Sequence, residues 1–148
     1  MRNNSSSLIK TLGVLGLIPF IASTLAFHFN FYHYGLLAQS VFVAYSAVIL
    51  SFLSGAIWGQ VLEQPFQSKC KILLIASNVV ALIAWCGLLI DQPHMSLLLL
   101  LCGYISIFWL EVRWLKQIRP DQSYYPNLRF GLTVAVCAMH LLMLYPKI

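Results

Sequence analysis

Five long apolar stretches dominate the chain, and the short segments between them hold most of the charged residues and prolines. Crossing a hydrocarbon core of about 30 Å takes about 20 helical residues, and each stretch reaches or approaches that length. The pattern therefore predicts an all-α integral membrane protein in which residues 1–148 form one domain, a bundle of five transmembrane helices. The predicted spans cover residues 8–27, 35–62, 72–90, 95–115 and 128–145.

The composition agrees with the membrane class. Hydrophobic residues make up 60% of the chain, charged residues make up 9%, and the mean hydropathy is +0.82. A soluble domain carries about a quarter charged residues, so this chain has too few charges to cover a surface that faces water. The four cysteines fall singly, without the paired spacing of a zinc site or a disulfide framework. We predict no cofactor.

The basic residues predict the orientation of the bundle, because Lys and Arg near helix ends are retained on the cytoplasmic side. Eight of the nine Lys and Arg residues lie in the amino-terminal segment, in the second loop, or between the end of the fourth span and the start of the fifth. These are Arg2, Lys10, Lys69, Lys71, Arg113, Lys116, Arg119 and Arg129; the ninth is Lys147. The amino terminus is therefore predicted inside and the carboxyl terminus outside.

The net charge of +5 favours anionic lipid head groups as the partner and not a nucleic acid. The first span is interpreted as a retained helix. The alternative is a cleaved signal peptide, since Arg2 and Lys10 precede its apolar core and Ala26 ends a tolerable cleavage site.

Glu111 is an acidic residue at the end of the fourth apolar stretch. The 16 residues before it, Met95 to Leu110, cover about 24 Å of helix. That is too short to cross the bilayer, so Glu111 is placed in the last turn on the cytoplasmic side. It is either a solvated helix end with snorkelling side chains or half of an interhelical ion pair with Arg129, which begins the next span at the same depth. A proton-coupled site at Glu111 is the third interpretation.

The second span carries small residues at every fourth position: Ala47, Ser51, Gly55 and Gly59. A face of small side chains lets another helix backbone approach closely, so we predict a helix-packing face. A substrate path along the same face is the alternative. Trp58, beside Gly59, is predicted to anchor the helix at the membrane interface.

Three further residues break the apolar pattern inside the spans. Asn78 is predicted to find a hydrogen-bond partner within the bundle or to contact a ligand. The hydroxyl of Thr133 is predicted to bond the carbonyl of Arg129 in its own helix. Pro19 should kink the first helix and free a carbonyl that a neighbouring helix must satisfy.

The four histidines are predicted to face the outer side of the bundle. They are His28, His33, His94 and His140. Imidazoles gathered on one side of a bundle can bind a metal ion or haem iron. None of the four has the spacing of a known ligand pair, so they are weak metal candidates and no metal site is predicted with them.

Four stretches resemble a known family: "LGVLGLIPF", "YSAVILSFLSGAIWG", "NVVALIAW" and "YYPNLRFGLT". They are similar to the domain of unknown function 3429 family of small multi-span membrane proteins, which includes transmembrane-protein-69-like chains. The resemblance favours retention of the first span. It implies a location in the bacterial inner membrane or, for a eukaryotic chain, the mitochondrial inner membrane. The positions that match its motifs are Gly55, Trp58, Gly59, Leu128, Arg129 and Thr133. Family members more often carry Asp where this chain has Glu111.

Three classes of function remain open from the sequence. The first is a non-catalytic scaffold or assembly factor that stabilises a larger membrane complex, with another membrane protein or a second copy as its partner. The second is a small carrier or channel subunit, which needs polar groups near the middle of the membrane. The third is a metal- or haem-binding membrane protein that uses the outer histidines. We favour the first, because no nucleophile–base spacing supports an enzyme.

Overall fold

The computed structural model describes residues 2–29, 35–62, 68–115 and 125–145, and these residues form helices with no β-strand. The elements are α1 (Arg2–Leu15), α2 (Ile18–His28), α3 (Gly35–Leu62), α4 (Ser68–Leu89), α5 (Pro93–Leu110), the π-helical turn η1 (Glu111–Leu115) and α7 (Tyr125–Leu144). The predicted all-helical class is confirmed for this part of the chain.

Five helical segments are long and apolar enough to cross a membrane: Ser7–His28, Gly35–Leu62, Ser68–Leu89, Pro93–Trp114 and Asn127–Leu144. Each lies where the sequence predicts a span. The second agrees at both ends, and the third begins four residues earlier than predicted, because the polar turn Ser68–Lys71 is already helical. The chain is therefore a membrane protein built from five apolar helical segments.

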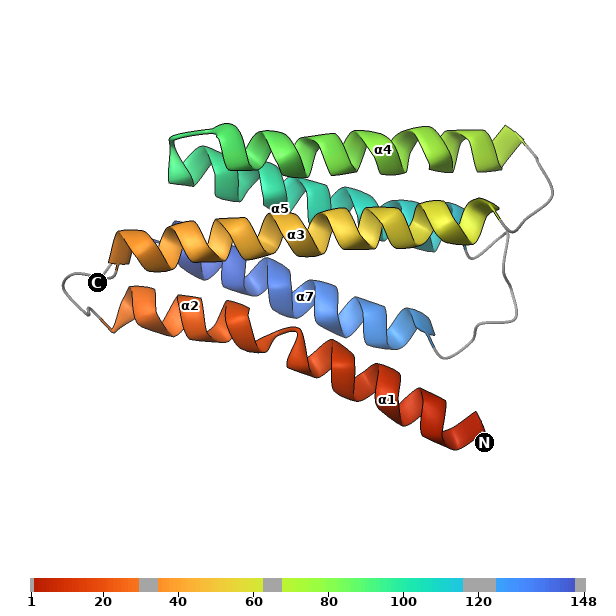
Figure 1. Cartoon of the computed structure of the whole chain (residues 1–148), viewed down its shortest axis with the longest axis horizontal. Helices are drawn as coiled ribbons and strands as arrows, with labels where there is room; N and C mark the ends of the chain where they lie inside the picture. The colour runs from red at the N-terminus through yellow and green to blue at the C-terminus, as the bar shows by residue number, and fades with distance from the viewer. Residues whose placement is uncertain (1, 30–34, 63–67, 116–124, 146–148) are drawn as a thin grey trace.

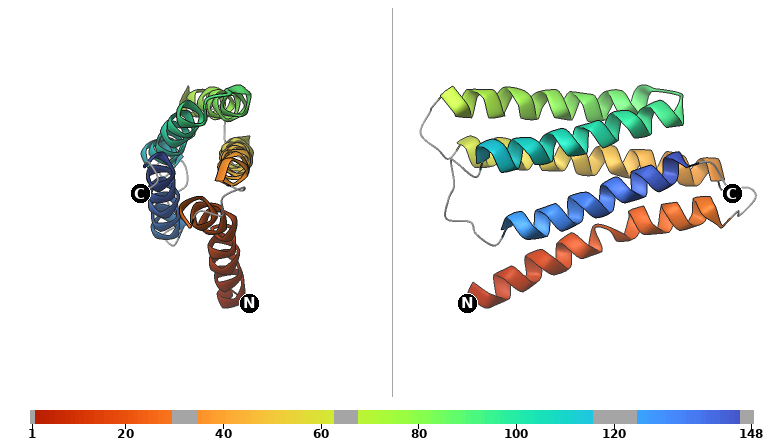
Figure 2. Two further views of the ribbon diagram at one scale, coloured as in Figure 1. Left: turned by 90° about the vertical axis from the view of Figure 1, so that its left-hand side faces the viewer. Right: turned by 180° about the vertical axis from the view of Figure 1, so that it is seen from behind.

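The helices run up and down beside one another, and α3 and α4 form an antiparallel pair (Figure 1). Viewed end-on, α4, α5, α7, α2 and α3 follow one another around the bundle, while α1 diverges from it (Figure 2). Large apolar side chains also cover the outer surface, such as Leu36 and Phe52. This outer surface faces lipid, where an exposed Leu or Phe carries no cost.

The first span is broken into α1 and α2 at Gly16 and Leu17 (Figure 1). Pro19 lies in the first turn of α2, where its missing N–H has no intrahelical partner to lose. The phenol of Tyr45 in α3 donates a hydrogen bond of 3.0 Å to the carbonyl of Gly16. The predicted kink is thus confirmed, and the carbonyl that a neighbouring helix satisfies is that of Gly16, one residue after the Leu15 carbonyl that Pro19 leaves without its usual donor.

The fourth span ends in a π-helical turn that the sequence did not predict. In such a turn the hydrogen bonds reach one residue further than in an α-helix, which shifts the angular position of the residues that follow. Glu111 lies inside the bundle with 8% of its surface exposed, whereas Arg113 is exposed. The two side chains of the turn therefore face different surroundings.

At Gly103, α5 packs tightly against Leu50 of α3. A Cβ added there would lie 2.5 Å from Cδ2 of Leu50, whereas a Cβ at Gly55 would meet nothing within 4 Å. Leu50 is fully buried in the core, so it has little room to move. We predict that Gly103→Ala lowers the free energy of unfolding by about 1–3 kcal/mol relative to Gly55→Ala.

The comparison with Gly55→Ala removes the gain in helix propensity that both substitutions share. Both variants are to be unfolded reversibly in the same detergent as the parent chain. Equal stability of the two alanine variants would contradict the close packing of α5 on α3.

Candidate functional site

A charged pair joins the π-helical turn η1, which follows α5, to α7. Nε of Arg129, in the first turns of α7, lies 3.0 Å from Oε2 of Glu111 at the start of η1. The side chains are 11% and 10% exposed. A pair this well removed from water needs both partners in place, since either charge alone would be buried without compensation. The structure thus brings together the two residues of the proposed interhelical pair, in place of a solvated helix end.

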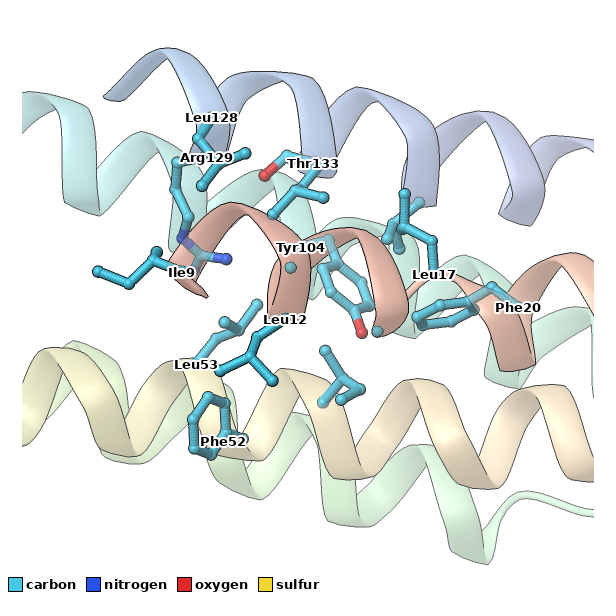
Figure 3. Close-up of a pocket in the computed structure, with 15 residues that line it drawn as sticks. Ile9, Leu12, Leu17, Phe20, Phe52, Leu53, Tyr104, Leu128, Arg129 and Thr133 are labelled. Carbon is cyan, nitrogen blue, oxygen red and sulfur yellow. The ribbon is translucent and has the colours of Figure 1, made fainter. Parts of the chain in front are cut away.

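A cavity of about 270 Å³ lies beside this pair, between α1, α2, α3, α5 and α7. Its walls are mostly aliphatic and aromatic, and Arg129, Thr133 and Tyr104 supply its polar groups (Figure 3). The part of the chain that the structure describes shows no bond from Thr133 to the carbonyl of Arg129, so that prediction is wrong. Thr133 is half-buried in the cavity wall instead.

A second polar cluster lies in the core at Ser46, Tyr104 and His140. His140 is fully buried. Its Nδ1 lies 2.8 Å from the carbonyl oxygen of Val136, and its Nε2 lies 2.8 Å from Oγ of Ser46. The phenol of Tyr104 donates to the carbonyl of Ser46 at 2.9 Å. These bonds connect α3, α5 and α7, so the cluster ties three helices together in the membrane interior.

The hydrogen bonds of His140 determine the tautomer of its neutral ring. The carbonyl of Val136 can only accept, so Nδ1 of the neutral ring carries the proton. Nε2 is then an acceptor, and the hydroxyl of Ser46 donates to it. Phe42 and Tyr104 pack against the ring at centroid distances of 4.8 and 5.3 Å. Both ring nitrogens are occupied, so His140 is held as a structural hydrogen-bonding group.

The described histidines His28, His94 and His140 do not come together as a set of metal ligands. His28 ends α2, and its Nε2 lies 3.0 Å from the carbonyl oxygen of Leu142. His94 is exposed in the first turn of α5, and His33 lies outside the described residues. Among the residues described, no three His, Cys, Asp or Glu side chains come together in a way that could hold a metal ion.

The small-residue face of α3 is divided between the interior and the exterior. Ala47 is buried, and Ser51 is half-buried. Gly55 and Gly59 are exposed, and a Cβ at either would meet nothing within 4 Å. The predicted helix-packing face therefore enters the bundle at Ala47 and Ser51, while the two glycines face away from the bundle.

Asn78 also faces outward. Its amide nitrogen donates 2.9 Å to the carbonyl of Leu74, one turn earlier in α4, and its side chain is exposed. The partner of Asn78 within the bundle is thus a carbonyl of its own helix, and a ligand contact stays a prediction. Trp58 is 44% exposed near the end of α3. Its role as an anchor at the membrane interface stays a prediction.

The sequence interpretation missed the serine contacts between helices. Besides Ser46, the hydroxyl of Ser54 in α3 donates to the carbonyl of Ser77 in α4. Both serines are buried. A small hydroxyl in an apolar run is the signal that could have identified them, because such a group in lipid needs an acceptor. Its partner on another helix cannot be read from one helix alone.

We predict that Glu111→Gln and Arg129→Gln each lower the free energy of unfolding by about 3 kcal/mol, because each leaves the other charge buried alone. The double variant should cost less than the sum of the two. Reversible unfolding in detergent measures all three, with Arg113→Gln as the exposed control at the same end of α5. Strict additivity would show that the pair contributes no coupling.

For the core cluster, Ser46→Ala removes the donor to Nε2 of His140 and leaves a buried nitrogen without a partner. We expect a loss of about 1–3 kcal/mol in the free energy of unfolding. Ser40→Ala is the matched control, since the exposed Ser40 hydroxyl only bonds the carbonyl of Leu36 in its own helix. If both alanine variants were equally stable, the cluster would not hold the helices together.

Known proteins resemble the chain along most of its length. It matches the family described as "Protein of unknown function (DUF3429)" over residues 5–145. It is 40% identical over 79 residues to Transmembrane protein 69 of Xenopus tropicalis, a match that covers 53% of this chain and 31% of that protein. The chain therefore spans less than a third of that relative's length. No solved structure matches it. The four motifs and the match from residue 5 to residue 145 agree, and the chain belongs to the DUF3429 family of proteins of unknown function.

Proposed function

We propose that this chain is a multi-pass inner-membrane protein that acts without catalysis, as a scaffold or assembly factor for a larger membrane complex. The observation that carries the proposal is the amide of Asn78, which faces outward near the middle of the 22-residue helix α4. Its amide oxygen accepts no hydrogen bond from the described residues. In hydrocarbon a polar group without a partner costs several kcal/mol, so this position favours contact with another protein.

The outward glycines lie on the same side of the bundle as Asn78. Ser54 of α3 contacts Ser77 of α4, and the two helices run antiparallel (Figure 1). From Ser54 to Gly55, and from Ser77 to Asn78, the side-chain direction rotates by about 100° around the helix axis. Because the two helices are antiparallel, both rotations lead to the same side of the helix pair. Gly55 and Asn78 therefore lie on one face. We define the α3–α4 outer face as Gly55, Gly59 and Asn78.

This face has the two properties that join helices in membranes. Open space at Gly55 and Gly59 admits the backbone of another helix, and a side-chain amide can hydrogen-bond across the contact. Both properties support a helix of a partner membrane protein as the occupant. The proposal requires no cofactor.

The proposed orientation has the amino terminus in the cytosol and the carboxyl terminus outside. The distribution of Lys and Arg, in which Arg129 is one of the residues counted, supports it. We propose the bacterial inner membrane as the location, or the mitochondrial inner membrane for a eukaryotic chain.

A small carrier subunit is the second candidate. It is supported by the buried imidazole of His140 with its bonds to Ser46 and Val136, since ionisable groups inside membranes often mark pathways. Every ring nitrogen of His140 is already bonded, so this support is weaker than that from the outward amide. The outer-histidine metal hypothesis gains no support from the positions of His28, His94 and His140.

Affinity purification of the full chain from its native membrane in mild detergent tests the proposal. We expect a second membrane protein in stoichiometric amount. Asn78→Leu should weaken its recovery roughly three- to thirtyfold, because an interhelical hydrogen bond in a membrane contributes about 0.6–2 kcal/mol. Gly55→Leu, which fills the open space on the α3–α4 outer face, should act in the same direction.

Ser106→Leu is the matched control, because Ser106 is an exposed polar residue on α5 and lies outside the α3–α4 outer face. Its partner recovery should equal that of the parent chain. Recovery of the chain as a homo-oligomer alone, unchanged by Asn78→Leu, would contradict the scaffold and favour the carrier.

A further inference from the structure

The cavity beside Arg129 opens sideways between α1 and α3. Helix α1 contacts α7 where Gly13 meets Leu132, and it diverges from α3 (Figure 1). Two residues that line the cavity are reachable from outside, since Leu12 of α1 is 58% exposed and Phe52 of α3 is 69% exposed. We call the cavity with this opening the α1–α3 groove. A molecule dissolved in the bilayer can enter it from the side.

Two side chains of α7 offer unused hydrogen-bond donors to the α1–α3 groove, and both line it (Figure 3). Arg129 is 9% exposed, and its guanidinium makes one hydrogen bond to the described residues, from Nε to Glu111. A guanidinium has five N–H donors, so those of the terminal nitrogens are left over. The hydroxyl of the half-buried Thr133 donates to no described residue either. Residues four apart are neighbours on one helix face, so these donors adjoin.

The donors lie within the membrane span and not at its end. The apolar segment of α7 begins at Asn127, so at 1.5 Å per residue the backbone of Thr133 is about 9 Å inside it. A polar group at that depth is costly unless it has a partner. A ligand with a hydrogen-bond acceptor would supply one.

The charge balance favours an uncharged acceptor. The carboxylate of Glu111 compensates the guanidinium of Arg129, so the pair has no net charge that would attract an anion. The other residues that line the α1–α3 groove are uncharged. The oxygen of a carbonyl group can accept from the remaining N–H and O–H donors while the ion pair stays balanced.

The walls and the size of the groove favour a flat ring. The aromatic side chains of Phe20 and Tyr104 line it and are 1% and 2% exposed, so they are held in place by the core. Aromatic side chains pack well against other rings. The volume of about 270 Å³ is close to the lower end of the range for small-molecule sites. It suits one ring better than the two chains of a glycerolipid.

We propose that the α1–α3 groove binds an isoprenoid quinone, a neutral lipid with carbonyl oxygens on a flat ring. One carbonyl oxygen accepts from Arg129 and Thr133, the ring packs near Tyr104, and the tail leaves between Leu12 and Phe52 into the bilayer. A phospholipid fits less well, because its charged head group keeps the ester carbonyls near the membrane surface. The groove is separate from the α3–α4 outer face, so the site does not depend on the proposed protein partner.

Thermal unfolding of the full chain in detergent tests the proposal, because a ligand of the folded state raises the midpoint with its concentration. The probes are decylubiquinone, decylbenzene, which has the same tail on a ring without carbonyls, and didecanoylglycerol, which has carbonyls without a ring. The apparent Kd of decylbenzene should be at least about tenfold higher than that of decylubiquinone, as for loss of a hydrogen bond to a charged group. Equal affinity for these two, or tighter binding of didecanoylglycerol, would overturn the proposal.

Thr133→Val tests the carbonyl contact. It removes the hydroxyl at similar size and breaks no hydrogen bond of the described residues, so the ligand-free chain should unfold at the parent midpoint. The apparent Kd of decylubiquinone should rise about two- to tenfold, and Thr133→Ser should restore it. Thr11→Val is the matched control, because the exposed Thr11 hydroxyl bonds the carbonyl of Ser7 in its own helix and does not line the groove. Equal affinity in the two valine variants would overturn the proposal.

A pair of tryptophan variants tests the position of the site. Leu12→Trp fills the groove from a residue that lines it, and the apparent Kd of decylubiquinone should rise at least about fivefold. Leu15→Trp is the matched control, since Leu15 is exposed on the same helix and does not line the groove. Equal affinity in both tryptophan variants would place the quinone elsewhere and overturn the proposal.

Discussion

The bilayer interior supplies no water, so a polar group inside it must find its partner in protein or in another bound molecule. This constraint explains most of the interior of the bundle. The imidazole of His140 is bonded at both nitrogens, and the carbonyl freed at Gly16 accepts from Tyr45. The carboxylate of Glu111 accepts from Arg129. Most of these bonds join residues of different helices, and the bond within α7 orients the His140 ring that bonds to α3. Satisfying the polar groups therefore also determines how the helices pack.

Two places stand apart from this pattern, and the proposed function starts from the first. Asn78 presents an amide outward from α4, beside the open surface at Gly55 and Gly59. Arg129 presents its terminal nitrogens to a groove that opens toward the lipid. The first position suits a helix of another protein, because it combines space with a hydrogen-bonding group.

The sequence predicts the spans well because crossing hydrocarbon imposes a length and a composition that a single chain must show. It also predicts the break at Pro19, whose effect is local, and the level shared by Glu111 and Arg129. It does not predict which way a residue faces when every face of a helix is apolar. The outward positions of Gly55 and Asn78 depend on how α3 and α4 pack, which neither helix shows by itself. The π-helical turn and the contact between Ser46 and His140 depend on tertiary structure in the same way.

Photo-crosslinking in the native membrane tests most directly the claim that another protein covers the outward amide. A photoreactive amino acid replaces either Leu82 or Ile105. Leu82 is exposed on α4 one turn beyond Asn78, and Ile105 is exposed on α5. The account predicts a discrete protein adduct from position 82 and only lipid adducts from position 105. Lipid adducts alone at both positions would show that Asn78 faces the bilayer without a partner, and would contradict the account.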